Sequence, residues 1–126
     1  MSKILENLLY TESHEWVKLE DGKAKIGITD HAQESLGDIV FLNLPEDGDP
    51  VTAGESFCDV ESVKAVSDIY SPVTGTICAV NDALADSPEL LNEDPYAAWI
   101  CEIKDITDKE SFLSPAEYEA FLQKED

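Results

Sequence analysis

A single lysine stands apart from every other basic residue of this acidic chain. The 126 residues include 28 acids and only eight basic side chains, all of them lysines. Lys64 is the only basic residue between Lys25 and Lys104, an interval that contains sixteen acids. An amine isolated in this way, between two strand-like segments, suggests a point of covalent attachment. The alternative, on position and charge alone, is an ordinary exposed lysine in a hairpin turn.

The segments on either side of Lys64 have the sequence pattern of paired strands. Residues 56–61 and 65–70 are expected as strands, and if they pair as the arms of a hairpin, the lysine lies in the connecting turn. An acyl group joined to this amine would sit on a long flexible stem anchored to a rigid sheet. Acylation would also remove the only positive charge of this region.

Further strand-like segments recur about every 8 to 12 residues, which is typical of an antiparallel β core. Asp21-Gly22 indicates a tight hairpin turn. A short helix is expected over residues 29–37, and a second one near 88–91 within an otherwise irregular acidic stretch, 81–95. The remaining strands are expected over residues 16–19, 24–28, 39–44, 76–80 and 99–103.

The C-terminal tail predicts a helix from about residue 114. Ser114 suits the N-cap, Pro115 suits the first helical position, and Glu117 completes a capping box. Apolar side chains at positions 118, 121 and 122 give that helix one face to pack. No linker is long enough to divide the chain. We therefore expect residues 1–126 to form one mostly β domain with short helices and a C-terminal helix.

Composition excludes several classes of partner. The formal charge of −20 argues against nucleic acid, because duplex binding depends on cations that neutralise phosphates. Binding to anionic lipid is disfavoured for the same reason. No window of about 18 apolar residues predicts a membrane span. No leader, signal peptide or lipidation motif is recognisable, so we expect a cytoplasmic protein.

The cysteines and histidines do not form a catalytic or metal-binding pattern. Cys58, Cys78 and Cys101 each lie in an apolar strand-like run, where we expect core thiols. They include no Cys-x-x-Cys pair, and His14 and His31 add no ligand spacing, so no metal site is expected. Motifs for an activated nucleophile or a phosphate loop are missing, which argues against a self-sufficient enzyme.

Three blocks of sequence resemble the glycine cleavage system H proteins. Residues 61–75, around Lys64, look like the family's lipoylation segment. Residues 10–17 contain Ser-His-Glu-Trp, as in its opening motif, and residues 27–38 contain its Thr-Asp-His-Ala-Gln helix entry. Other lipoyl and biotinyl domains lack the last two blocks. A biotin carrier would also have methionines at both positions flanking the lysine.

This resemblance implies a fold and a function. The fold is a barrel-sandwich hybrid of the lipoyl-domain type, and lipoate is joined by an amide bond to the lysine that matches Lys64. The protein is a non-catalytic carrier in glycine catabolism, expected as a monomer. It takes the aminomethyl group of glycine from a pyridoxal-phosphate glycine decarboxylase (P protein) to a folate-dependent aminomethyltransferase (T protein). A dihydrolipoyl dehydrogenase (L protein) then reoxidises it.

The resemblance also implies roles for four further residues. Ser13, Glu15 and Asp68 match the residues of a cleft that holds the aminomethyl-lipoyl arm. Two carboxylates and a hydroxyl suit a protonated amine, which needs hydrogen-bond acceptors and nearby negative charge. The alternative is that both acids are merely solvated. Glu61 is expected to help the lipoylating enzyme distinguish Lys64 from the seven other lysines.

One segment departs from the family pattern. Many members have Pro-Tyr-Gly-x-Gly-Trp before the last strand, whereas this chain has Pro-Tyr-Ala-Ala-Trp at residues 95–99, one residue shorter and without glycine. If those glycines have positive φ, this loop must take another path, because alanine is disfavoured there.

Two other functions are compatible with parts of the sequence. An H-like lipoyl relay would keep the fold and the modification but donate lipoyl groups to other enzymes or pathways. An unmodified acidic interaction domain is the third possibility. The joint retention of Lys64, Glu61 and Asp68 counts against that third possibility.

Overall fold

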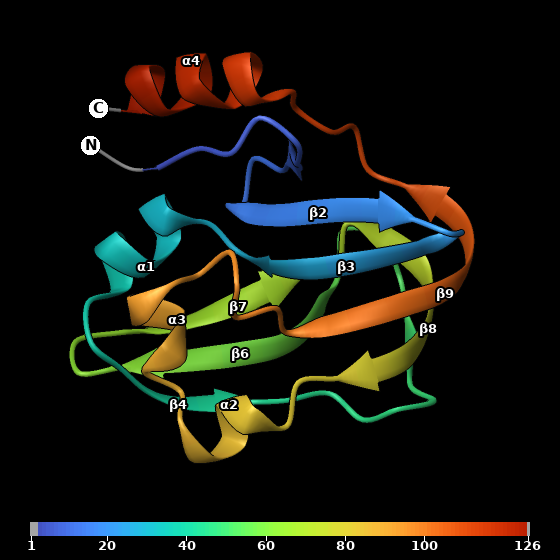
Figure 1. The fold of residues 1–126 in the computed structure, drawn as a ribbon, viewed down its shortest axis with the longest axis horizontal. Coiled ribbons are helices and arrows are strands. Elements are labelled where there is room, and N and C mark those ends of the chain that lie inside the picture. The colour runs from blue at the N-terminus through green and yellow to red at the C-terminus, as the bar shows by residue number, and fades with distance from the viewer. Residues whose placement is uncertain (1–2, 126) are drawn as a thin grey trace.

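Two antiparallel sheets face each other across a shared hydrophobic core (Figure 1). The computed structural model describes residues 3–125. The three-stranded sheet has the order β4-β6-β7, and the six-stranded sheet has the order β1-β2-β3-β9-β8-β5. In chain order the strands are β1 (Leu9–Tyr10), β2 (Glu15–Glu20), β3 (Lys23–Ile28), β4 (Ile39–Asn43), β5 (Pro50–Val51), β6 (Ser56–Ser62), β7 (Val66–Tyr70), β8 (Val73–Val80) and β9 (Cys101–Lys109). The predicted mostly β class, with two sheets, is confirmed.

The first hairpin forms where Asp21-Gly22 predicts it. Glu20 pairs with Lys23, and Asp21 and Gly22 both have positive φ, 54° and 76°. This combination is typical of a two-residue turn whose twist matches that of the strands. On β3, Gly27 lies under the buried indole of Trp16, and a Cβ there would lie 2.5 Å from the ring. Only glycine permits this close approach.

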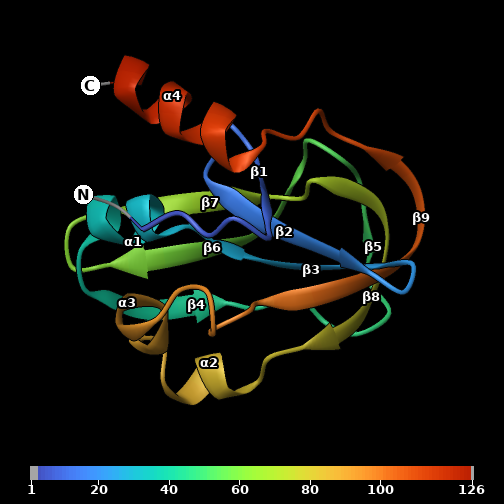
Figure 2. The ribbon, with the colours of Figure 1, turned by 45° about the horizontal axis from the view of Figure 1, so that its top comes forward.

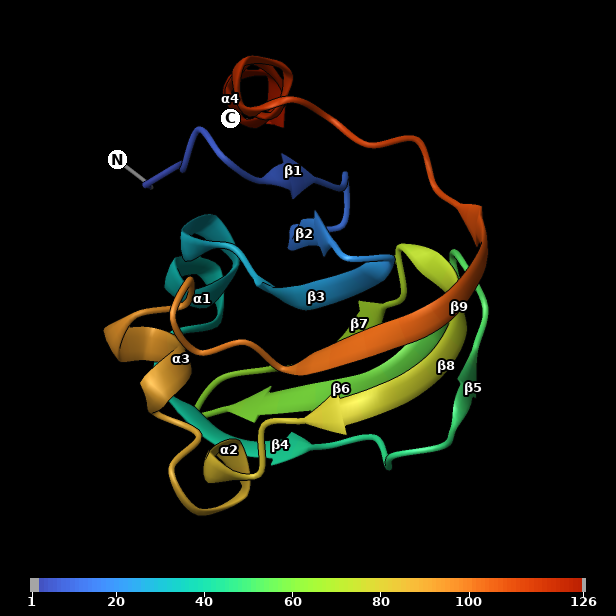
Figure 3. The same cartoon turned by 45° about the vertical axis from the view of Figure 1, so that its right-hand side comes forward.

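Three short helices lie together at one side of the two sheets (Figure 3). The first, α1 (Asp30–Leu36), begins at Thr29, whose Oγ1 accepts from the amide of Ala32 at 3.2 Å. It ends at Gly37, which has a φ of 78°. The acidic stretch contains two helices instead of the one expected, α2 (Ala83–Asp86) and α3 (Leu90–Glu93). Each has one buried leucine that anchors it to the core.

The last strand differs from the prediction. β9 begins two residues later than expected, at Cys101, and continues six residues further, to Lys109. Its second half is mostly exposed and has no inward-facing apolar pattern, so the sequence gives no hydrophobic signal for it. Pairing with β8 as far as Val73–Lys109 extends the strand instead. β1 and β5 were not predicted, because two residues are too few to establish a period.

The C-terminal helix α4 (Pro115–Glu125) packs on the N-terminal segment, outside the six-stranded sheet (Figure 2). The predicted capping box is present: Ser114 Oγ accepts from the amide of Glu117 at 3.2 Å, and Glu117 Oε1 accepts from the amide of Ser114 at 2.8 Å. Tyr118 is buried and stacks on Tyr10, with ring centroids 4.6 Å apart. Its hydroxyl lies 2.7 Å from Thr29 Oγ1, which joins α4 to the start of α1.

The segment that lacks the family's glycines closes without positive φ. Among the described non-glycine residues, only His14, Asp21 and Asp105 have positive φ. The amides of Ala97 and Ala98 both donate to the carbonyl of Asp94, at 3.2 and 3.0 Å. This helical turn is a path that alanine adopts without strain.

The three cysteines are free, and two of them lie in the core. Cys58 and Cys101 are buried, and burial raises the pKa of both thiols, which makes them unreactive. Cys78 is only half-buried, so its assignment to the core was wrong. On β8 only Val73 and Ile77 face fully inward.

Candidate functional site

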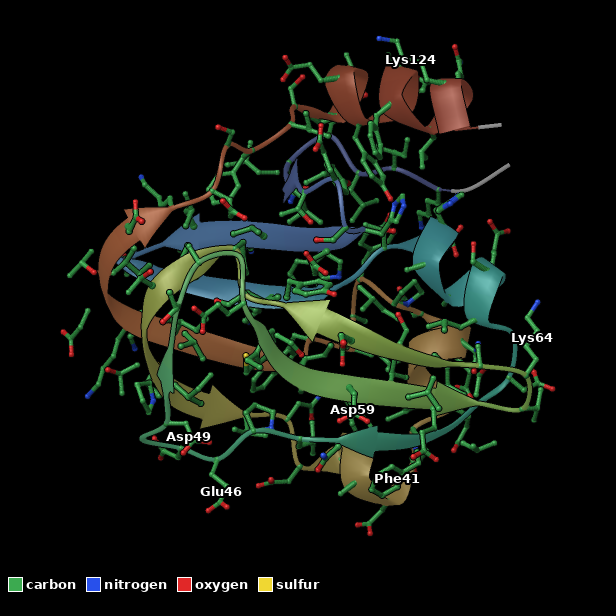
Figure 4. The ribbon with its side chains drawn as sticks, turned by 180° about the vertical axis from the view of Figure 1, so that it is seen from behind. Phe41, Glu46, Asp49, Asp59, Lys64 and Lys124 are labelled. Carbon is green, nitrogen blue, oxygen red and sulfur yellow. The ribbon has the colours of Figure 1, made fainter. Side chains whose placement is uncertain are left out.

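Lys64 lies in the turn between β6 and β7, as the sequence predicts. Ser62 closes this turn: its amide donates to the carbonyl of Ala65 at 2.8 Å, and its Oγ accepts from the amide of Ala65 at 3.1 Å. The amide of Lys64 lies 3.3 Å from the same oxygen. Figure 4 shows the lysine side chain at the outer tip of the turn. The two strands and the Ser62 hydroxyl therefore fix the backbone of the turn from which the exposed lysine extends.

The turn is also attached to the segment between α1 and β4. The amide of Val63 donates to the carbonyl of Asp38 at 3.0 Å. The aliphatic stem of Lys64 passes over Gly37, where a Cβ would lie 3.4 Å from Lys64 Cε. Within residues 3–125, no hydrogen bond or ion pair involves the Lys64 ammonium group. The amine is therefore accessible to a modifying enzyme, and an amide bond there would break no contact of the fold.

Glu61 lies near the end of β6, three residues before the lysine. Its register partners are Phe41 on β4 and Val66 on β7. The side chain is half-buried and belongs to the outward row of the strand, because Cys58 and Val60 face the core. Glu61 is therefore presented on the same outer surface as the lysine turn.

A second constellation surrounds Glu15, the first residue of β2. Its side chain is buried, with only 2% of the residue exposed. Glu15 Oε1 accepts from Thr11 Oγ1 and from Ser13 Oγ, both at 2.6 Å. Glu15 Oε2 accepts from the amide of Tyr70, at the end of β7, at 3.3 Å. The two hydroxyl protons thus go to one oxygen, and the other oxygen has a single longer hydrogen bond.

The backbone before β2 forms a narrow turn that brings these groups together. His14 has a φ of 71° and donates its amide to the carbonyl of Thr11 at 3.1 Å. The amide of Glu15 donates to Thr11 Oγ1 at 3.0 Å, and the amide of Thr11 donates to the carbonyl of Glu15 at 3.0 Å. Thr11 is therefore the residue that holds both the backbone and the carboxylate of Glu15.

Burial raises the pKa of the Glu15 carboxyl group. Hydrogen bonds from Ser13, Thr11 and the amide of Tyr70 offset part of this effect, and the charge of Glu110 raises the pKa further. A carboxylate that has lost its water and faces another negative charge gains most from a cation. The electrostatics of this site thus favour a protonated amine.

Glu15 faces a pocket of about 520 Å³. The pocket is lined by residues from four parts of the chain: Thr11, Glu12, Ser13, Glu15, Gly54, Tyr70, Ser71, Glu110, Ser111 and Leu113. Tyr70 is the last residue of β7, whereas Lys64 precedes the first. Four residue steps of β7 correspond to about 13 Å, so an arm anchored on Lys64 has to follow this strand to reach the pocket.

The structure brings together two of the three predicted cleft residues. Ser13 and Glu15 are hydrogen-bonded inside the pocket, whereas Asp68 is exposed on β7 between the lysine turn and Tyr70. Sequence reasoning missed Thr11 and Glu110. The Thr-x-Ser-x-Glu spacing is a signal for Thr11, because two hydroxyls precede a carboxylate. Glu110 is ninety-five residues from Glu15, and no local pattern connects them.

Residues 3–125 contain no group of three or more His, Cys, Asp or Glu side chains arranged to hold a metal ion. No helix in this range is long and apolar enough to cross a membrane.

Comparisons with known proteins agree on one family. Residues 8–125 match the family described as "Glycine cleavage H-protein". The chain is 59% identical over 124 residues to the glycine cleavage system H protein of Lachnoclostridium phytofermentans, with 98% of each chain covered. It is 50% identical over 127 residues to the H protein of Rubrobacter xylanophilus, with both chains fully covered.

A solved structure agrees with the fold. The crystal structure of a glycine cleavage system H protein from Mycobacterium marinum superposes with a TM-score of 0.91 at 40% identity, covering 95% of this chain and 99% of the other. These matches confirm the family that the motifs indicated, and with it the covalent lipoyl cofactor. The chain belongs to the glycine cleavage H-protein family, whose members are non-catalytic lipoyl carriers of the aminomethyl group.

Proposed function

We propose that Lys64 is the lysine that carries the lipoyl group, and that Ser13, Glu15 and Asp68 hold the loaded arm. The observation that carries this proposal is the exposed amine, without a hydrogen bond or ion pair to the described residues, on a turn fixed by Ser62. Lipoate supplies a dithiolane, which accepts and releases the aminomethyl group of glycine and undergoes oxidation and reduction. No residue of this chain has to perform that chemistry, which fits a carrier.

Attachment requires only an accessible amine. The Lys64 amine loses a proton and attacks the carbonyl carbon of an activated lipoyl group, such as the acyl adenylate. An amide bond forms, the bond between the acyl carbon and the phosphate oxygen breaks, and AMP leaves with the electron pair of that bond. No side chain of this carrier other than Lys64 takes part. The contribution of the fold is to hold the turn that presents Lys64. Glu61, on the same outer surface, serves as a recognition residue for the lipoylating enzyme.

The pocket protects what the carrier transports. A protonated amine that enters it can donate to Glu15 Oε2, which has only the 3.3 Å bond from Tyr70. The buried carboxylate stabilises the positive charge. Asp68, exposed on β7 between the turn and the pocket, provides a second negative charge along the path of the arm. The Glu15 carboxylate therefore acts as an anchor for the amine.

The remaining partners follow from this assignment. The carrier visits a glycine decarboxylase (P protein), an aminomethyltransferase (T protein), a dihydrolipoyl dehydrogenase (L protein) and the lipoylating enzyme. Its net charge of −20 steers it toward basic patches on these enzymes, most strongly at low ionic strength. It works as a cytoplasmic monomer.

Exchange of label between bicarbonate and glycine tests this function. The lipoylated protein is combined with the decarboxylase, and Lys64→Arg is compared with Lys104→Arg, a change at another exposed lysine. Lys64→Arg should abolish exchange while Lys104→Arg retains it. A protein that is lipoylated on Lys64 yet supports no exchange would be a lipoyl relay. Full exchange by Lys64→Arg would overturn the assignment of the lysine.

A further inference from the structure

Exposed apolar side chains gather beside the lysine turn. Six large hydrophobic residues are exposed within the described part of the chain, and four of them lie at this end of the three-stranded sheet. We call these four the lysine-end face: Val40, Phe41, Val63 and Val66. Phe41 is 50% exposed, and Val63 and Val66 are each 68% exposed. An acidic chain that clusters apolar groups at one place has a surface suited to a partner.

The backbone makes this face continuous. Phe41 on β4, Glu61 on β6 and Val66 on β7 are register partners and form one row across the sheet. The pairing of β4 shifts register between Ile39 and Phe41, and both Val40 and Phe41 consequently face outward. Such a bulge often re-aims side chains next to a functional site.

The remaining member, Val63, is also held close. The amide of Val63 donates a hydrogen bond to the carbonyl of Asp38, which attaches the turn to the start of β4, next to Val40. The apolar face therefore borders the segment that presents Lys64.

Acidic side chains border the apolar row. The next row of the same sheet consists of Asn43, Asp59 and Asp68, with Asn43 Nδ2 donating to Asp59 Oδ1 at 3.0 Å. Figure 4 shows Asp59 on β6, the strand that leads to Lys64, and Phe41 on the neighbouring strand β4. A complementary partner has to offer an apolar hollow bordered by lysine or arginine side chains.

We propose that the lysine-end face is the docking surface for the enzyme that acylates Lys64, and that this enzyme presents an apolar hollow with a basic border. This inference rests on the proposed attachment at Lys64. The enzyme has to approach the amine itself, and the amine adjoins this face. The Glu15 pocket lies at the other end of β7, so a partner that receives the loaded group has to reach that end instead.

Initial rates of acylation test the apolar part of this surface. Unmodified protein is titrated against a purified lipoate-protein ligase with lipoate and ATP. The double variant Phe41→Thr, Val66→Thr keeps strand-forming residues and removes the apolar contacts. Its KM should rise about tenfold or more while kcat is unchanged, as expected for loss of contacts worth about 1.4 kcal/mol or more. Leu19→Thr, a 42% exposed leucine on β2, is the matched control and should stay within about twofold of wild type.

Salt dependence tests the acidic border. Asp59→Asn should lower kcat/KM at low ionic strength and flatten its decrease with added salt, because surface charges act mainly on association. Glu46→Gln is the matched control, since Glu46 is also an exposed acid but lies far from Lys64, at the other end of the molecule in Figure 4. It should retain the wild-type salt dependence.

The outcomes separate this inference from the proposed function. Wild-type protein that the ligase leaves unmodified would contradict attachment at Lys64. Wild-type protein that is modified, with a double variant whose KM matches that of Leu19→Thr, would overturn the docking surface alone. Thermal unfolding checks that each variant is folded. If the double variant is not folded, the nearly isosteric single variant Val66→Thr takes its place. A KM for Val66→Thr that matches that of Leu19→Thr would then overturn the docking surface.

Discussion

Replacing Thr11 by valine tests the hydrogen-bond network that holds Glu15. Valine has nearly the shape of threonine, so the change removes a hydroxyl and leaves the packing of this buried site unchanged. That hydroxyl donates to Glu15 Oε1 at 2.6 Å and accepts from the amide of Glu15 at 3.0 Å. The variant therefore loses one bond to a carboxylate and leaves one buried amide without its acceptor.

The expected loss of stability follows from these two bonds. A hydrogen bond to a charged group contributes about 1.5 to 3 kcal/mol, and an unsatisfied buried donor costs about 1 to 3 kcal/mol. Because the turn can relax, we expect a total near the sum of the lower limits, about 2.5 kcal/mol. At 25 °C this lowers the folding equilibrium constant by a factor of about 70. The pKa of Glu15 should also rise further, because a bond that stabilises the ionised form is gone.

Urea unfolding at neutral pH measures this loss, with the free energy of unfolding obtained by linear extrapolation. Thr11→Ser, which keeps the hydroxyl, is the matched control and should lose less than about half as much. Ser13→Ala removes one donor to the same carboxylate oxygen and leaves the amide of Glu15 paired, so it should cost about 1.5 kcal/mol. A Thr11→Val protein within about 0.5 kcal/mol of wild type would refute this account of the site.

Three further predictions concern other parts of the molecule. Burial raises the pKa of Glu15 above its ordinary value of 4.5. The contribution of this group to the free energy of unfolding is therefore complete below pH 4.5 and is lost as the pH rises through the pKa of the folded protein. Glu15→Gln should remove this decrease from a pH series of unfolding free energies, and an unchanged series would contradict the shift. Gly27→Ala places a Cβ 2.5 Å from the Trp16 indole and should cost about 1 to 3 kcal/mol in thermal unfolding; wild-type stability would show that the ring can move at no cost. Ser114→Ala removes the cap from the amide of Glu117 and should cost about 1 kcal/mol, whereas an unchanged melting temperature would mean that α4 is held by its packing alone.

Local sequence was sufficient wherever a few neighbouring residues determine the structure. Asp21-Gly22 predicted the first hairpin because both residues adopt positive φ readily, and Ser114 with Glu117 predicted the start of α4. The lysine turn was predicted from the two strand-like segments around it, although β7 begins one residue later than expected. Each of these features depends on contacts within a few residues.

The features that were missed depend on distant contacts. β1 consists of two residues, and its pairing with β2 depends on a turn in which His14 has positive φ. The second half of β9 is a strand because β8 lies beside it, although its own side chains are mostly exposed. Glu110 reaches the Glu15 pocket only because the amide of Glu110 donates to the carbonyl of Pro72 at 2.8 Å, across the strand pair. No periodicity in the sequence reports these pairings.

The most direct test of the central claim is an intact mass, followed by peptide mapping, of protein produced in a lipoate-competent cell. The account predicts one lipoyl increment on the peptide that contains Lys64, and none in Lys64→Arg from the same cells. A lipoyl domain of known competence, expressed alongside, shows that the cell's lipoylating enzyme is active. An increment on another lysine, or an unmodified Lys64 while that second domain is lipoylated, would contradict the claim.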